Sequence, residues 1–239
     1  LAAKPISPML CGNFIEYGYG VQTEPMSAEM LFNESTLHIV PVVNPDGVDL
    51  VTGNLTSGKF YTEAVSIAKK YPNIPFPDGW KANIAGTDLN LQYPAGWENA
   101  RAVKFAQGYT SPAPRDFVGA SPLSAPESAA VYEYTRRHDF ALTLSYHTQG
   151  EVIYWKYLDL EPNNSREIAE TFSAVSGYPI EETPYASGFA GYKDWFIQDF
   201  NRPGYTVEAG RGVNPLPITD FNSIYAKNLG ILTYGALVT

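Results

Sequence analysis

This chain has a single cysteine, a low proportion of charged residues and no long apolar run. The single cysteine, Cys11, excludes an internal disulfide, so the fold does not depend on an oxidising compartment. Only 17% of the 239 residues are charged, with 25 acidic and 16 basic residues and a net charge of -9. Nucleic-acid binding is therefore not expected, because phosphates require a basic face. The longest apolar run, near residues 230–238, is too short for a membrane span of about 20 residues.

Apolar and aromatic residues are plentiful, at 44% and 14% of the chain. This composition argues against disorder and supplies one sizeable core. Apolar periodicity predicts helices over residues 6–17, 59–70, 97–107, 164–176, 191–200 and 218–234, and strands over residues 37–43, 140–146, 151–155 and 205–208. Alternating strands and helices predict an α/β fold, with a mixed sheet flanked by helices on both faces. With no repeat or linker, residues 1–239 are expected to form one domain.

Two local signals mark the ends of predicted elements. The sequence Asn-Pro-Asp-Gly at residues 44–47 predicts a turn after the strand at residues 37–43. Ser124 and Glu127 have the spacing of a capping box, so a helix is expected from there to about His138.

Polar residues at the ends of the predicted strands are the candidates for chemistry. His147 and Glu208 each end a largely apolar strand, the position at which α/β proteins build sites. A carboxylate there is costly to desolvate unless it is paired or functional. The alternative is that each is a strand terminus facing solvent. We expect His38 to be packed or hydrogen-bonded, His138 to be a cation at a helix end, and Cys11 to be a core residue.

Several motifs resemble those of the M14 metallocarboxypeptidases in order and rough spacing. These are NPDG at residues 44–47, GTDLN at 86–90, SYH at 145–147 and YTVE at 205–208. Finer matches are similar to the branch that cleaves γ-D-glutamyl–diaminopimelate bonds: VNPDGVD at 43–49, WKAN at 80–83, YPAGWE at 93–98, PRDF at 114–117, HTQG at 147–150 and YKDWF at 192–196. The resemblance covers essentially the whole chain. It implies the α/β fold of the zinc carboxypeptidases, N-terminally incomplete and lacking the family's opening strands.

The resemblance also implies roles for individual residues. His147 matches the last zinc ligand, and Glu208 matches the general base that activates water and then protonates the leaving amine. Lys81 falls where the family has an arginine that stabilises the oxyanion, and a lysine supplies a point charge there. Asn90 matches an asparagine that binds the substrate's terminal carboxylate. Tyr185 matches a mobile tyrosine that closes over substrate, and Tyr192 is the alternative.

Two departures from the family pattern affect this interpretation. The arginine of the Asp-x-Asn-Arg motif is Leu91, so another group must grip a carboxylate, and Arg115 and Arg211 are candidates unless they are simply surface arginines. The family's His-x-x-Glu zinc motif falls on residues 1–4, where Leu1 has no ligand atom and Lys4 brings a positive charge. His147 alone cannot hold zinc tightly against water, because zinc sites use three or four protein ligands.

Two functional hypotheses follow from the resemblance. In the first, a zinc metallopeptidase cleaves γ-D-glutamyl–diamino acid bonds in bacterial cell-wall peptides, with its first zinc motif missing in this chain. In the second, a pseudo-peptidase binds such peptides without cutting them. A third interpretation is an unrelated α/β domain whose motifs coincide, and it would be supported if the strands of His147 and Glu208 were not neighbours in one sheet. The expected partner is a cell-wall peptide; endo- or exopeptidase action, compartment (cytoplasm or cell wall) and oligomeric state are left open.

Overall fold

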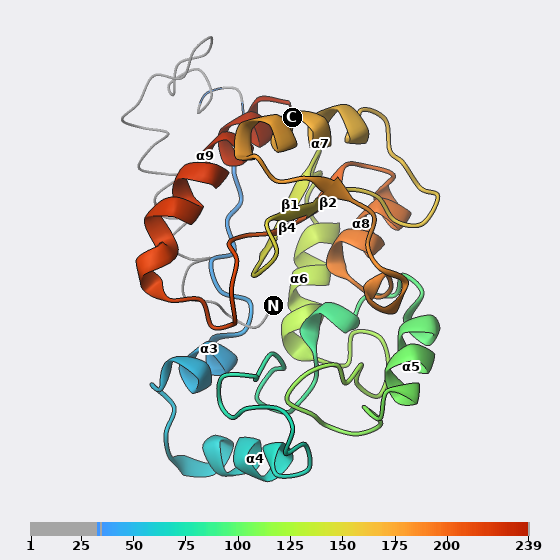
Figure 1. The fold of residues 1–239 in the computed structure, drawn as a ribbon. Helices are drawn as coiled ribbons and strands as arrows, with labels where there is room; N and C mark the ends of the chain where they lie inside the picture. Colours follow the sequence, from blue (N-terminus) through green and yellow to red (C-terminus); the bar gives the residue numbers. More distant parts are fainter. Residues whose placement is uncertain (1–32, 34, 239) are drawn as a thin grey trace.

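A short mixed sheet lies at the centre of the chain, in a computed structural model that describes residue 33 and residues 35–238 (Figure 1). Its strands are β1 (Thr143–His147), β2 (Val152–Tyr154), β3 (Ile180–Glu181) and β4 (Gly204–Glu208).

The helices of the described residues are α3 (Pro45–Thr52), α4 (Gly58–Ala68), α5 (Trp97–Ala106), α6 (Pro126–Arg136), α7 (Ser165–Ser176), α8 (Tyr192–Phe200) and α9 (Phe221–Leu237). Three 3-10 turns are also present: η1 (Leu89–Leu91), η2 (Tyr185–Ser187) and η3 (Ile218–Asp220). The helix predicted at residues 6–17, Cys11 and the residue 1–4 motif lie outside the described residues.

The strand order is β1-β4-β2-β3. β1 runs parallel to β4, β2 runs antiparallel to β4, and β3 runs parallel to β2. The β1–β4 register places His147 opposite Glu208, so the two carboxyl-terminal strand ends meet at one edge. The observation that would have supported the third interpretation, strands that are not neighbours, is therefore not found in the described sheet.

Helices cover both faces of the sheet, as the sequence predicts. On one face, Tyr205 and Val207 of β4 pack with residues of α7 and α9, including Phe172 and Ile231. On the other face, α8 packs against β1 and β4, and the ring of its Trp195 lies 4.4 Å from that of Tyr132 of α6, tilted by 35°. Side chains alternate along a strand, so the apolar residues of β4 that face α7 and α9 leave Thr206 and Glu208 on the α8 side. The mixed sheet with helices on both faces is therefore confirmed for the described residues.

The prediction of a strand at residues 37–43 is wrong. Residues 35–43 have no regular secondary structure, and the sheet described here does not include them. Leu37 and Val40 are about half exposed, at 50% and 51%. An apolar run becomes a strand only where a neighbour pairs with its backbone, and none of the described strands does so here. His38 is hydrogen-bonded, as one of its two expected settings, because its Nδ1 and the hydroxyl of Tyr134 lie 2.6 Å apart.

The two local signals at element ends are also corrected. Residues 44–47 begin helix α3 instead of forming a free turn, because the side chain of Asn44 accepts a hydrogen bond from the backbone N–H of Gly47. Ser124 and Glu127 do not form a capping box. Ser124 donates to Gln92, and the Glu127 carboxylate accepts from Asn83 at 3.1 Å, so partners distant in sequence take both side chains.

In the part of the chain that the structure describes, no helix is both long enough and apolar enough to cross a membrane.

Candidate active site

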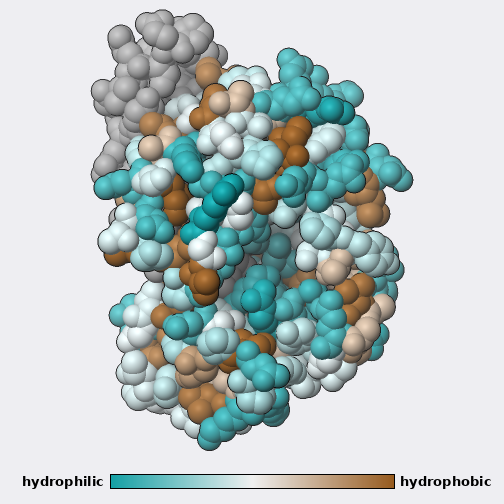
Figure 2. Space-filling model, in the orientation of Figure 1, coloured by the Kyte–Doolittle hydropathy of each residue, from teal (hydrophilic) through white to brown (hydrophobic). Residues whose placement is uncertain are grey.

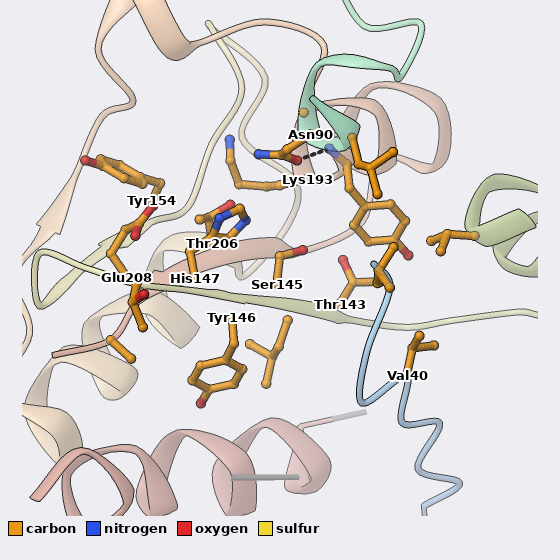
Figure 3. Close-up of a pocket in the computed structure, with 18 of the residues that line it drawn as sticks. Val40, Asn90, Thr143, Ser145, Tyr146, His147, Tyr154, Lys193, Thr206 and Glu208 are labelled. Atoms are coloured by element: carbon orange, nitrogen blue, oxygen red, sulfur yellow. Dashed lines mark hydrogen bonds between the residues drawn. The ribbon is translucent and has the colours of Figure 1, made fainter. Parts of the chain in front are cut away.

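The central pair of the candidate site is His147 and Glu208. They are register partners at the carboxyl ends of β1 and β4, and the backbone N–H of Ala209 donates to the carbonyl of His147 at 2.8 Å. Figure 3 shows the His147 ring on the same side of β1 as Ser145, with Tyr146 on the opposite side toward the helix below. The sheet therefore presents an imidazole and a carboxylate at one edge, which is an arrangement suited to proton transfer.

This pair opens on a hollow of about 990 Å³. Figure 2 shows a recess near the middle of one face, with hydrophilic residues around it. Five of the seven site residues predicted from the sequence line the hollow: Lys81, Asn90, Arg115, His147 and Glu208. The folding of distant segments thus brings together side chains from four separate parts of the sequence.

Tyr185 and Arg211 are not among the residues that line this hollow. Tyr185 lies on η2, is 72% exposed, and packs edge-on against Phe189. The guanidinium of Arg211 is largely exposed and pairs with Glu151 at 3.0 Å.

Lys81 is held by an ion pair. Its ammonium donates to both carboxylate oxygens of Asp88, at 3.0 and 2.8 Å, and Asp88 is fully buried. Burial alone would raise the pKa of Asp88, but the Lys81 charge and the hydrogen bonds from Lys81 and the Asp116 backbone outweigh it. The result is a carboxyl whose pKa lies well below its usual range. Lys81 therefore neutralises the buried carboxylate of Asp88, and it also has the positive charge that its predicted role requires.

Asn90 has a fixed orientation. Its side-chain oxygen accepts a hydrogen bond from the backbone N–H of Tyr192 at 3.2 Å. The amide nitrogen consequently points the other way, into the hollow (Figure 3). Tyr192, the alternative to Tyr185, is packed beside Tyr93, and its hydroxyl bonds to Thr135 at 3.0 Å. Burial raises the pKa of Tyr192 to about 12, so the phenol stays neutral at physiological pH.

Arg115 shares one carboxylate with a buried lysine. Its Nε donates to Asp116 at 2.8 Å, and Lys104 pairs with the other oxygen of Asp116 at 2.7 Å. Burial alone would lower the pKa of Arg115, but Asp116 and then Asp88 raise it overall. The guanidinium is half-exposed at the hollow, so part of its hydrogen-bonding capacity remains open to a ligand.

Two loops next to the central pair are tied together. The hydroxyl of Thr148 donates to the side-chain oxygen of Asn214 at 2.8 Å, and the amide of Asn214 donates back to the carbonyl of Thr148 at 3.1 Å. The N–H of Gly150 donates to the carbonyl of Gly210 at 2.8 Å. These bonds fix the segments that directly follow β1 and β4, and so hold His147 and Glu208 in register.

Tyr154 and Lys193 are among the residues that line the hollow without having been predicted as site residues. Tyr154 of β2 lies beside Glu208 in Figure 3; burial first, and then the charges of Glu208 and Glu181, raise its pKa. Lys193 lies near Asn90 and His147 in the same view. The YKDWF motif contained Lys193, but a lysine near the start of an amphipathic helix is ordinarily read as solvent-facing. Only its burial in the lining of the hollow distinguishes Lys193 from a lysine that faces solvent.

A family-type zinc centre does not fit the described residues by themselves. Among residues 33 and 35–238, no group of three or more histidine, cysteine, aspartate or glutamate side chains could hold a metal ion. His147 would supply one ligand, whereas zinc sites take three or four from the protein. The positions at which the family motif has the other two ligands are occupied by Leu1 and Lys4, and both lie outside the described residues.

Comparisons with known proteins agree on one family. The family profile of the zinc carboxypeptidases, Peptidase_M14, matches residues 4–228. The γ-D-glutamyl-L-diamino acid endopeptidase 1 of Lysinibacillus sphaericus is 48% identical over 211 residues, covering 88% of this chain and 51% of that protein. The chain spans about half the length of the curated relatives that it matches.

Solved structures share the fold at low sequence identity. Thrombin activatable fibrinolysis inhibitor aligns with 100% of this chain and 60% of its own, with a TM-score of 0.65 and 19% identity. Murein-tripeptide amidase MpaA from Escherichia coli O157 aligns with 98% of this chain and 76% of its own, with a TM-score of 0.56 and 20% identity. Since the family profile spans most of the sequence and the relative from L. sphaericus is 48% identical, the chain belongs to the zinc carboxypeptidase family, Peptidase_M14.

Proposed function

We propose that this chain acts on cell-wall peptides as part of a peptidase that hydrolyses γ-D-glutamyl–diamino acid bonds. The observation that carries the proposal is the pairing of His147 with Glu208 at one edge of the sheet, opening on a hollow that Asn90 also lines. The 48% identity to an endopeptidase of that name supports the choice of substrate class. The activity of the whole protein is part of the proposal, since the chain spans about half of that relative.

In this proposal Glu208 is the proton carrier. Its carboxylate takes a proton from the attacking water and then delivers it to the amine that leaves. Tyr154 stays protonated beside it, because burial and the neighbouring carboxylates raise its pKa. Asn90 holds a carboxylate of the substrate through its amide N–H groups, which orients the scissile bond toward Glu208. Lys81 lines the same hollow and contributes positive charge, anchored by Asp88.

The second candidate is binding of the same peptides without hydrolysis. The observation that favours it is the lack of any three-ligand metal group in the described ranges, 33 and 35–238. The sequence at residues 1–4, where Leu1 and Lys4 replace the histidine and glutamate of the family motif, points the same way. In this case the hollow recognises the peptide, and Glu208 contributes only to binding.

Metal content and turnover separate the two candidates. The purified chain is incubated with zinc, its metal content is measured by elemental analysis, and His147→Ala is the control. Hydrolysis of L-Ala-γ-D-Glu-L-Lys is then followed by release of L-lysine, with Glu208→Gln as the control variant. Stoichiometric zinc that is lost with His147→Ala, together with hydrolysis lost with Glu208→Gln, supports the peptidase. Binding of the peptide without zinc or hydrolysis supports the second candidate. If the peptide neither binds nor is cleaved, both are wrong.

A further inference from the structure

Arg115 lines the hollow, and the proposed chemistry does not use it. Its side chain is 46% exposed, and its Nε donates to the carboxylate of Asp116 at 2.8 Å. The N–H groups on its two Nη atoms donate to none of the residues that the structure describes. These groups have the planar geometry that binds a carboxylate through two parallel hydrogen bonds. Arg115 is therefore a candidate for recognising an anionic group of a ligand.

The ion pairs around Arg115 leave one positive charge without a carboxylate of its own. Lys81 pairs with Asp88 at 2.8 Å, whereas Lys104 and Arg115 share Asp116, at 2.7 and 2.8 Å. The backbone N–H of Asp116 donates to Asp88 at 3.0 Å and so joins the two groups. Three cations therefore face two carboxylates. Because the Lys104 side chain is only 9% exposed, the surplus charge that a ligand in the hollow can reach is that of Arg115.

The backbone on both sides of Arg115 is fixed. The carbonyl of Pro114 accepts a hydrogen bond from the backbone N–H of Lys81 at 2.7 Å, which ties the segment of Arg115 to that of Lys81. Asp116 has a φ of 66°, in the left-handed region that residues other than glycine rarely adopt, and its N–H bond to Asp88 holds it there. A binding group on a backbone held in this way needs little ordering when a ligand arrives, which favours affinity.

The substrate class proposed above carries an anion that suits such a group. When D-glutamate is joined through its γ-carboxyl, its α-carboxylate stays free. This carboxylate lies on the acyl side of the scissile bond, separated from the scissile carbonyl by a short aliphatic spacer. A glutamate joined through its α-carboxyl has its free carboxylate at the end of the side chain instead. A cation that reads the α-carboxylate would therefore distinguish the two kinds of linkage.

We propose that Arg115 binds the free α-carboxylate of the γ-D-glutamyl residue. This inference rests on the proposed function for its substrate class. A guanidinium that holds a carboxylate through two hydrogen bonds rejects the corresponding amide, because the amide is uncharged and presents N–H groups to a donor. Arg115 thus acts as a specificity-determining residue, which selects peptides with a free glutamyl α-carboxyl over those in which it is amidated.

The test uses three peptides that differ in one carboxylate each. They are L-Ala-γ-D-Glu-L-Lys, the same peptide with the glutamyl α-carboxyl amidated, and the same peptide with the C-terminal carboxyl amidated. Affinities are measured by calorimetry for the whole chain and for Arg115→Met, with a chelator present so that the peptides stay intact. The unmodified chain should bind the first peptide about 10- to 100-fold more tightly than its α-amide. In Arg115→Met that preference should disappear, while the ratio between the first peptide and its C-terminal amide stays the same.

Controls separate recognition from folding and from charge. Arg115→Met leaves Asp116 paired with Lys104, so thermal unfolding should change little. Arg115→Lys keeps the charge without the planar fork, and should retain part of the preference; it also decides the question if Arg115→Met does not fold. Arg166→Met is the matched control, because it removes an arginine that is 68% exposed, pairs with Glu170 at 3.0 Å and is not among the residues lining the hollow. It should keep the full preference.

Four results would overturn the inference. The unmodified chain could bind the first peptide and its α-amide equally, the preference could survive in Arg115→Met, or Arg166→Met could abolish it as well. In the fourth, Arg115→Met would remove a preference for the C-terminal carboxylate instead, so that Arg115 reads the other end of the peptide. Failure of the unmodified chain to bind any of the three peptides would refute the proposed function, and this inference with it.

Discussion

Replacing Lys81 with methionine removes the cation from a buried ion pair and should destabilise the protein at neutral pH. Asp88 is fully buried and accepts hydrogen bonds from Lys81, from the backbone N–H of Asp116 at 3.0 Å and from that of Asn90 at 3.3 Å. Methionine keeps most of the aliphatic stem but leaves the carboxylate with its two backbone donors alone. The structural task of Lys81 can therefore be measured separately from any catalytic one.

The expected loss in the free energy of unfolding follows from how deeply Lys81 and Asp88 are buried. Breaking a fully buried pair from one side costs about 3–5 kcal/mol. The Lys81 side chain is 29% exposed and two backbone donors remain, so we expect a loss of about 2–3 kcal/mol in the free energy of unfolding. For a protein of this size, that loss corresponds to a fall in Tm of about 4–12 °C.

The dependence on pH supplies the sharper test. The pKa of Asp88 is depressed in the folded state, so its stabilisation is present above the unfolded value of about 3.9 and is lost as the pH falls toward the folded pKa. Without Lys81, burial dominates and Asp88 takes up a proton at a higher pH. The difference in stability between the original chain and Lys81→Met should therefore be largest near pH 7 and shrink below about pH 4.

Denaturant unfolding at pH 7, 5 and 3 measures this difference. The matched control is Lys59→Met, which removes an exposed lysine that lies 3.9 Å from Glu63 and should change stability very little. A loss for Lys81→Met that is the same at pH 3 as at pH 7 would refute the electrostatic reasoning. A loss no larger than that of Lys59→Met would show that Asp88 does not depend on Lys81.

Three further substitutions test other parts of the structure by denaturant unfolding. Asn44→Ala removes the N-cap of α3, which binds the N–H of Gly47, and should cost about 1 kcal/mol or more; an unchanged stability would contradict the cap. Tyr192→Phe removes the hydroxyl that bonds to Thr135 and should cost about 1 kcal/mol; absorbance titration should also lose a phenol ionising near pH 12, and loss of one ionising near pH 10 would contradict its burial. Gly119→Ala puts a methyl group into a backbone with φ of +83° and against the side-chain amide of Gln92, and should cost more than about 1 kcal/mol; a neutral effect would show that the loop relaxes freely.

The identity of most elements could be predicted from local sequence. The strand that ends at Glu208, the helices α4, α5, α7, α8 and α9, and the mixed sheet with helices on both faces follow the predicted pattern. The prediction failed where a distant partner decides the local structure. Residues 37–43 have the composition of a strand but do not pair with the described sheet, and Ser124 and Glu127 bond to Gln92 and Asn83 instead of capping a helix.

For the site, the sequence determined which residue types stand at the ends of the strands. It placed an imidazole at 147 and a carboxylate at 208, each after an apolar run, and the resemblance to one family added Lys81 and Asn90 as candidates. The tertiary structure decided which of these meet. It pairs His147 with Glu208, ties Lys81 to Asp88, and buries Lys193 in the lining of the hollow, while Tyr185 and Arg211 are not among the lining residues. Periodicity reports which face of an element is buried, but contacts between segments far apart in the chain arise only when those faces pack together.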